Sequence, residues 1–123
     1  MKREGSPRNI DERSFEFACD VVVLCEKIRR RRGAATLIAS QLLRSGTSVG
    51  ANLAEARSGQ SKADFLAKCR VSLKEARETH YWLRIIHRTG ILQTSEVDTL
   101  IEESNELIAI LTAIVKNASR PAA

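Results

Sequence analysis

Apolar residues recur every three to four positions along most of the chain, which is the spacing of one face of an α-helix. No stretch shows the alternation of apolar and polar residues that is typical of a strand. Gly33, Gly59 and Gly90 divide the pattern into four segments, because glycine accepts the left-handed backbone in which helices commonly end. Proline occurs only at Pro7 and Pro121, so four long, uninterrupted helices are predicted.

The first two helices are expected over about residues 11–32 and 35–58. Capping patterns at residues 61–64 and 95–98, each with a serine and an aspartate three residues later, place the starts of the third and fourth helices. The residues expected in the core are Phe15, Ala18, Val21, Val22, Leu24, Cys25 and Ile28, then Ile38, Leu42, Val49, Leu53 and Ala56, then Phe65, Cys69, Leu73, Ala76, Leu83 and Ile86, and finally Val97, Leu100, Ile101, Leu107, Ile108, Leu111, Ile114 and Val115.

Long helices joined by short connections pack as antiparallel neighbours. The predicted fold is therefore an all-α, up-down-up-down antiparallel four-helix bundle. The chain has 123 residues, which fits one domain; we assign residues 11–118 to it, with a flexible N-terminal tail over 1–10 and a C-terminal tail over 119–123. Hydrophobic residues make up 43% and aromatic residues only 4%, so the core must be mainly aliphatic.

Cysteine usage and the N-terminus both bear on location. Cys19, Cys25 and Cys69 form no CxxC pair and are odd in number, which supports neither a disulfide framework nor a zinc site. The charged N-terminus precedes no apolar stretch, and the longest apolar segment, over 107–115, is too short to span a bilayer. We therefore expect a cytoplasmic protein.

Polar residues also follow helical spacing beside the apolar stripes. Such groups are partly desolvated, and an unpaired one costs about 1–3 kcal/mol, so they should form hydrogen bonds. Two interpretations are open: a solvated flank, or a polar network that fixes helix register or a subunit contact. The residues concerned are Gln41, Ser45, Ser48, Asn52 and Glu55 on the second helix, with Glu75 and Trp82 on the third.

Two stretches, QLLRSGTSVGANLAEA over residues 41–56 and EARETHYWL over 75–83, resemble the four-helix-bundle proteins encoded in 23S rRNA intervening sequences. The likeness is close in the second and third helices, extends to the first and fourth through apolar pattern and spacing, and leaves out residues 1–10. Similar folds occur in the accessory variability determinants of diversity-generating retroelements. The resemblance implies a homopentamer of bundles and a role in binding RNA or DNA. Residues that match the signature are Ser45, Ser48, Asn52, Glu55, Glu75, Glu78, Tyr81 and Trp82.

Charge is distributed unevenly along a chain of net charge +5. Residues 57–88 hold eight basic and three acidic residues, whereas 95–118 hold five acidic and one basic, so the bundle should be electrically two-sided. The basic side is a candidate phosphate-binding surface, or else an ordinary solvated face paired with acids of a neighbouring subunit. Its residues are Arg29, Arg30, Arg31, Arg32, Arg70, Lys74, Arg77, Tyr81, Arg84 and Arg88.

Opposite that basic stripe, the third helix carries Val71, Glu78, Trp82 and Ile85 outside the main core seam. If exposed together, the three apolar side chains would form a patch that self-association would cover. The alternative is that Trp82 packs on a neighbouring helix of the same bundle.

Three sequence features bear on catalysis or metal binding. Residues 46–50 fit the GxSxG pattern of hydrolases, but they lie within a predicted helix, where the two glycines suit close helix packing. The Glu-x-x-His spacing of di-metal bundles is absent, and Cys25 and Cys69 fall on core stripes. No catalytic residue, metal site or cofactor is therefore predicted.

The function expected is that of a non-catalytic homo-oligomer, pentameric by resemblance, with RNA or DNA as the leading partner. A protein-interaction module whose basic face meets acidic surfaces is the alternative. An enzyme is the third class, and it would need a substrate pocket that the sequence does not indicate.

Overall fold

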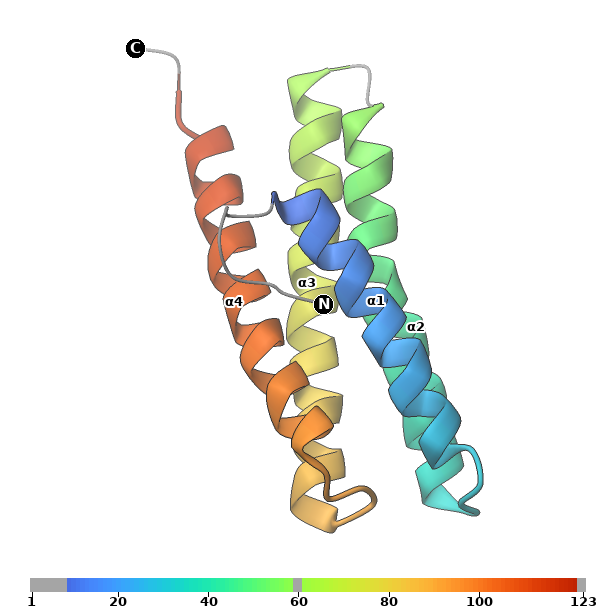
Figure 1. Cartoon of the computed structure of the whole chain (residues 1–123). Helices are drawn as coiled ribbons and strands as arrows, with labels where there is room; N and C mark the ends of the chain where they lie inside the picture. The colour runs from blue at the N-terminus through green and yellow to red at the C-terminus, as the bar shows by residue number, and fades with distance from the viewer. Residues whose placement is uncertain (1–8, 59–60, 122–123) are drawn as a thin grey trace.

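The computed structural model describes residues 9–58 and 61–121. Four α-helices run antiparallel to their neighbours in chain order (Figure 1). This confirms the predicted up-down-up-down bundle. The helices are α1 (Ile10–Ile28), α2 (Ala34–Arg57), α3 (Lys62–Thr89) and α4 (Ser95–Ala118).

The helices do not contact one another equally. Among the four pairs of neighbouring helices, α2–α3 has the most extensive contact and α1–α4 has the least. The α1–α2 and α3–α4 connections lie at the same end of the bundle, at the bottom of Figure 1. Positions late in α1, early in α2, late in α3 and early in α4 therefore come together at this end.

Aliphatic side chains fill the interior, as predicted. Leu53, Leu83 and Leu111 are at most 1% exposed, while Ile38 is only partly buried against the core. Five small hydroxyl residues are also buried, and in the described residues no buried side-chain nitrogen or oxygen lacks a hydrogen-bond partner. They can sit in an apolar core because each hydroxyl bonds a nearby backbone or side-chain oxygen.

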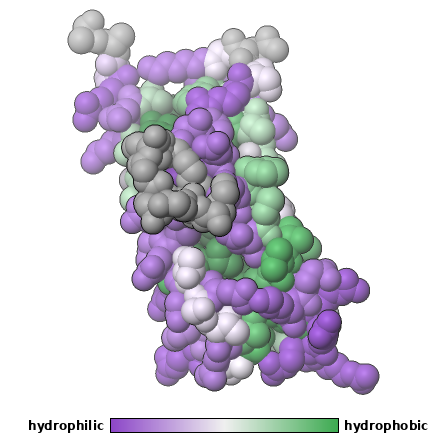
Figure 2. All heavy atoms as spheres, viewed as in Figure 1, coloured by the Kyte–Doolittle hydropathy of each residue, from purple (hydrophilic) through white to green (hydrophobic). Residues whose placement is uncertain are grey.

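The predicted core face of α1 is partly wrong. Phe15 is 67% exposed and Val22 is 42% exposed, whereas Phe17, which the prediction left out, is buried beside the correctly predicted Val21. Both sets follow helical spacing, so the pattern alone allowed either to face inward. Figure 2 shows apolar residues, in green, on the surface along α1 among polar neighbours.

Two helix boundaries also differ from prediction. The first helix ends at Ile28 instead of about residue 32, and Arg29 caps it with its backbone N–H bonded to the Cys25 carbonyl. Ser61 caps α3 by accepting a 3.1 Å hydrogen bond from the Asp64 amide, as predicted. Ser95, in contrast, is the first helical residue of α4, and Thr94 occupies the cap position with no side-chain cap hydrogen bond.

Glycine ends α3 as predicted, but α1 ends at Ile28, before Gly33, which instead caps the start of α2. Gly90 closes α3 with φ of 72°, and Gly33 precedes α2 with the same φ, a conformation that side chains with a Cβ rarely adopt. Gly59 lies outside the described residues, as do residues 1–8 and 122–123 of the predicted tails. None of the helices in the described part of the chain has the length and apolar character needed to cross a membrane.

Candidate nucleic-acid interface

A row of cations covers the outer face of α3. Arg70, Lys74, Arg77, Arg84 and Arg88 are all exposed, at the three-, four- and seven-residue intervals that place side chains on one helix face. The row spans roughly 27 Å at 1.5 Å per residue, about the axial length of eight base pairs. We call these five residues and Tyr81, which lies among them, the basic stripe.

The basic stripe is not neutralised from within the subunit. Across residues 9–58 and 61–121, none of its five cations makes an ion pair or a side-chain hydrogen bond. Some cations outside the stripe are paired: Lys68 meets Glu55 at 2.6 Å, and Arg57 meets Asp11 at 2.9 Å. Lys74 is near enough to Glu78 for its charge to help lower the pKa of that carboxyl, but no carboxylate forms an ion pair with any of the five cations in the described residues. A row of cations of this kind along one helix produces a field that attracts a polyanion.

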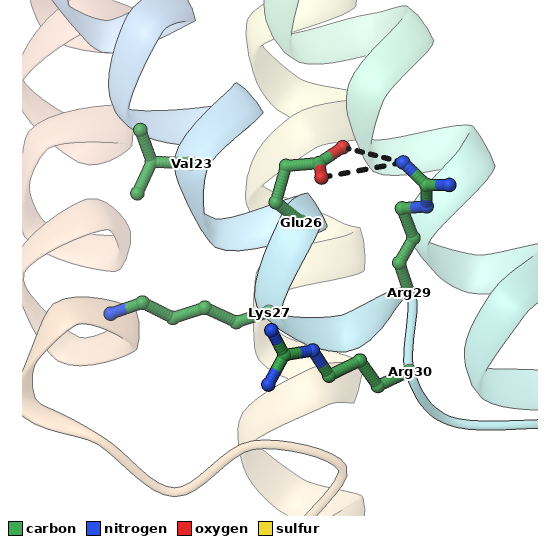
Figure 3. Close-up of a pocket in the computed structure, with 5 residues that line it drawn as sticks. All are labelled: Val23, Glu26, Lys27, Arg29 and Arg30. Carbon is green, nitrogen blue, oxygen red and sulfur yellow. Dashed lines mark hydrogen bonds and ion pairs between the residues drawn. The ribbon is translucent and has the colours of Figure 1, made fainter.

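A second basic group follows α1: the four consecutive arginines at positions 29–32, which we call the arginine turn. All are exposed, and only two have partners in the structure described: Arg29 pairs with Glu26 at 3.2 Å, and Arg31 donates to the carbonyl of Ile91. An open hollow of about 840 Å³ lies beside Arg29 and Arg30 (Figure 3). In that view Lys27 extends toward α4, where it meets Glu96 at 2.6 Å.

The fold brings the arginine turn and part of the basic stripe to one end of the bundle. Arg84 and Arg88 lie in the last turns of α3, and the bond from Arg31 to Ile91 joins the two connections at that end. The first turn of α2, which starts there, contains no acidic residue. The positive end of the α2 helix dipole therefore adds to the charge of the arginines.

The predicted polar stripe becomes a cross-helix network on α2 and α3. Arg44 reaches from α2 to two carboxylates of α3, Glu75 at 3.1 Å and Glu78, and Gln41 accepts a bond of 3.4 Å from it. Glu78 also accepts from the indole N–H of Trp82 at 3.0 Å. That indole bond first, and then the Arg44 guanidinium, lower the pKa of Glu78 against its partial burial.

Two other residues of the predicted stripe bond within α2, while Ser45 and Glu55 bond residues of α3. Ser48 and Asn52 bond backbone carbonyls one turn earlier in α2, at 2.7 and 2.8 Å. Ser45 is fully buried and accepts a 2.9 Å bond from Thr79 of α3. The stripe is thus a hydrogen-bonded seam at its buried edge and an ion-pair network at its surface.

The apolar residues flanking this network are exposed to different degrees. Val71 is 40% exposed, while Trp82 and Ile85 are half-buried, with Trp82 packed against the core of its own subunit. The Trp82 ring also meets Tyr81 edge-on, with ring centroids 5.5 Å apart. The patch therefore exposes less apolar surface than the sequence suggested. Its role in self-association remains a prediction.

The chain matches the family of the 23S rRNA-intervening sequence protein over residues 8–113. It belongs to that family. It is also similar to a crystal structure from Bacteroides thetaiotaomicron, described as a protein of unknown function from the S23 ribosomal protein family. The two share 36% identity and a TM-score of 0.81, with 88% of this chain and 99% of that one covered. Comparison with curated proteins gives no match.

Membership of the intervening-sequence family confirms the resemblance drawn from the α2 and α3 motifs. The structural neighbour supports the fold, and its description assigns no activity.

The residues considered for catalysis or metal binding have structural contacts in the fold. Ser48 of the GxSxG segment lies within α2, with its hydroxyl bonded to the Arg44 carbonyl. Gly46 allows close packing, because a Cβ there would come within 2.8 Å of Val21 on α1. His80 lies 2.9 Å from the Ser104 hydroxyl, and His87 lies 3.4 Å from Asp98. Among the residues described, no three His, Cys, Asp or Glu side chains gather as metal ligands.

The two cysteines expected in the core are buried thiols. Burial raises the pKa of the Cys25 thiol to about 11, and its sulfur lies 3.4 Å from the Ala39 carbonyl. Cys69 is fully buried, and burial likewise raises its pKa. A thiol with a raised pKa is a poor nucleophile at neutral pH, because little thiolate is present. Cys19 is exposed.

Sequence reasoning missed Arg44 and Thr79, both central to the α2–α3 seam. Arg44 sits three residues after Gln41 and four before Ser48, so its place on the polar stripe could have been read from spacing. Thr79 lies four residues after Glu75 on the core edge. The bidentate pair between Arg13 and Glu103, at 2.8 and 3.0 Å, was also missed; it joins α1 to α4, and no local pattern links residues so distant in sequence.

Proposed function

We propose that this protein is a non-catalytic, homopentameric, cytoplasmic bundle that binds RNA or DNA through the basic stripe of α3. The observation that carries the proposal is the set of five exposed cations on one helix face that form no ion pair or side-chain hydrogen bond in the described structure. Phosphate backbones bind such surfaces, because each contact releases condensed counterions. The arginine turn supplies further positive charge at one end of the stripe.

Assembly is part of the same proposal. The pentamer is implied by the family resemblance, and rotational symmetry would repeat the basic stripe around the ring. Repetition strengthens binding because linked sites act at high effective concentration. The likeness to accessory proteins of diversity-generating retroelements also belongs to the proposal, since it depends on resemblance alone.

A protein-interaction module is the second candidate. The observation in its favour is the acidic surface of α4, where Glu102 and Glu106 are exposed. The basic stripe of one subunit could meet such acids on another protein or another copy. Both candidates predict a basic surface that binds negative charge, and they differ in whether nucleic acid is bound at all.

Charge reversal at Arg70, Arg77 and Arg84 tests the proposal. We expect the triple glutamate variant to weaken binding to oligonucleotides at low salt at least tenfold. The slope of log affinity against log salt should fall by roughly one for each phosphate interaction that the substitutions remove. Fluorescence anisotropy across a salt series measures both quantities.

The matched control reverses three exposed cations outside the stripe, Lys62, Lys116 and Arg120, which changes the net charge equally. This control should retain most of the affinity, because local contacts and not overall charge hold the ligand. Undetectable binding by the wild-type protein at low salt, or equally weakened binding by the two variants, would refute the nucleic-acid proposal in favour of the protein-interaction module.

A further inference from the structure

Tyr81 is an exposed aromatic ring in the middle of the basic stripe. It is 55% exposed, with Arg77 four residues before it and Arg84 three residues after it on the same face. Its ring takes part in no hydrogen bond within the described residues. A phosphate-binding face needs cations and has no need of an exposed ring, so the position of Tyr81 requires a separate explanation.

The ring is held in place by a chain of contacts from the neighbouring helix. Tyr81 meets Trp82 at an interplanar angle of 68°. The indole N–H of Trp82 bonds Glu78, and Glu78 is bonded in turn by Arg44 of α2. An aromatic side chain supported in this way loses little conformational entropy when a ligand stacks on it.

A hollow lies beside the ring. It has a volume of about 370 Å³ and is lined by Tyr81, Arg84 and Arg88, with Ile101 of α4 among the other contributors. Volumes of this order hold small organic ligands. The lining combines the Tyr81 ring and two guanidinium groups with two isoleucines, a histidine and a threonine. An aromatic ring and apolar side chains beside two guanidinium groups suit a flat ring attached to a phosphate.

We propose that Tyr81, Arg84 and Arg88 form a stacking site for an unpaired base, so that the ligand of the basic stripe is single-stranded nucleic acid. The inference rests on the proposed function. An unpaired base offers its face to the Tyr81 ring, while the flanking phosphates meet the two arginines. Base stacking on an aromatic side chain tolerates any sequence. A duplex hides its base faces within the helix and can meet the stripe only through phosphates.

The test compares four chains of equal length on the full-length protein: oligo(U), oligo(dT), a mixed-sequence DNA duplex, and inorganic polyphosphate, which has no bases. Tyr81→Leu should weaken binding of the single strands about tenfold, because one base stack contributes roughly 1–3 kcal/mol. Binding of duplex and polyphosphate should stay within twofold of wild type. Tyr81→Phe keeps the ring and should bind single strands like wild type.

Trp82 provides a second readout, since it is the chain's only tryptophan and touches Tyr81. Single strands should quench its fluorescence in the wild-type protein and in Tyr81→Phe, and much less in Tyr81→Leu. A difference between oligo(U) and oligo(dT) would identify RNA or DNA as the preferred source of the base.

The outcomes separate the two proposals. If the wild-type protein binds none of the four chains, the proposed function fails and the stacking site fails with it. If duplex and polyphosphate bind but Tyr81→Leu leaves single-strand affinity unchanged, the stacking inference alone is overturned. Equal weakening of all four chains in Tyr81→Leu would also overturn it, because the ring would then support the fold or the arginines and not a base.

Discussion

Arg44 links α2 to α3, because its guanidinium meets Glu75 and Glu78 of α3 and also donates to Gln41 of its own helix. Exposed ion pairs usually contribute less than about 1 kcal/mol each. Here the side chain of Glu75 is only 16% exposed, and Glu78 is additionally bonded by Trp82. Interactions of this kind reinforce one another, so the network fixes the orientation of Trp82, and through it that of Tyr81.

The pKa of His80 differs between the folded and unfolded protein, so it makes stability depend on pH. Desolvation first, and then the nearby Arg84 charge, lower its pKa below the usual value despite an opposing bond to the Ile101 carbonyl. The unfolded chain therefore takes up a proton at His80 more readily than the folded protein does. His80 therefore lowers the free energy of unfolding as the pH falls below the pKa that His80 has in the unfolded chain. At pH values well above that pKa, His80 has no such effect.

We expect the free energy of unfolding to decrease between pH 7 and pH 5, and His80→Gln to flatten this decrease. Urea titrations at several pH values measure it. His87→Gln, at the chain's other histidine, is the matched control for removing an imidazole. A His80→Gln protein with the wild-type pH dependence would show that His80 does not contribute to it.

At the scale of elements, α1 and α2 approach closely where α2 carries Gly46. A Cβ at that position would lie 2.8 Å and 3.0 Å from the two methyl groups of Val21. Valine is stiff about χ1, so it cannot easily turn away. The GxSxG segment thus serves a packing role in this fold: its first glycine lets two backbones come together.

Gly46→Ala should destabilise the protein by about 1–3 kcal/mol through overpacking, although alanine in a helix normally gains up to about 1 kcal/mol over glycine. The measurement is chemical denaturation. Combining it with Val21→Ala removes the clashing methyl groups, so the double variant should lose less stability than the sum of the two single variants. Strict additivity, or a stabilising Gly46→Ala, would contradict this account of the α1–α2 contact.

At the scale of the whole molecule, charge and apolar surface occupy different faces. The outer face of α3 is basic, α4 exposes acids, and the edge between α2 and α3 carries Val71, Trp82 and Ile85. A second apolar surface runs along α1, around Phe15. The molecule therefore has two candidate surfaces for self-association, of which the sequence identified only the one on α3.

Trp82→Ala should lower the oligomeric mass measured by light scattering, because it removes the largest side chain of the α3 apolar edge. Val71→Glu, at an exposed position of the same edge, should do the same without opening the core, and circular dichroism should show both variants still helical. Phe15→Ala is the matched control on α1. A mass lowered by Phe15→Ala alone would move the subunit contact to the α1 surface.

The sequence by itself determined the helices, most of the core and the basic stripe. These follow from the 3.6-residue period, which fixes which residues share a face whatever the helix packs against. Thus Leu53, Leu83 and Leu111 are buried and Arg77 is exposed, as the spacing predicted.

Only the tertiary structure decided which of two apolar stripes of α1 turns inward, because Phe15 and Phe17 both fit a helical period and packing on α2 and α4 selects between them. It also decided which carboxylates of other helices Arg44 and Arg13 bond: Glu75 lies 31 residues from Arg44, and Glu103 lies 90 residues from Arg13. Periodicity describes a helix about its own axis. The neighbours that a side chain meets depend on how separate helices are placed, and that placement is a property of the whole packed bundle.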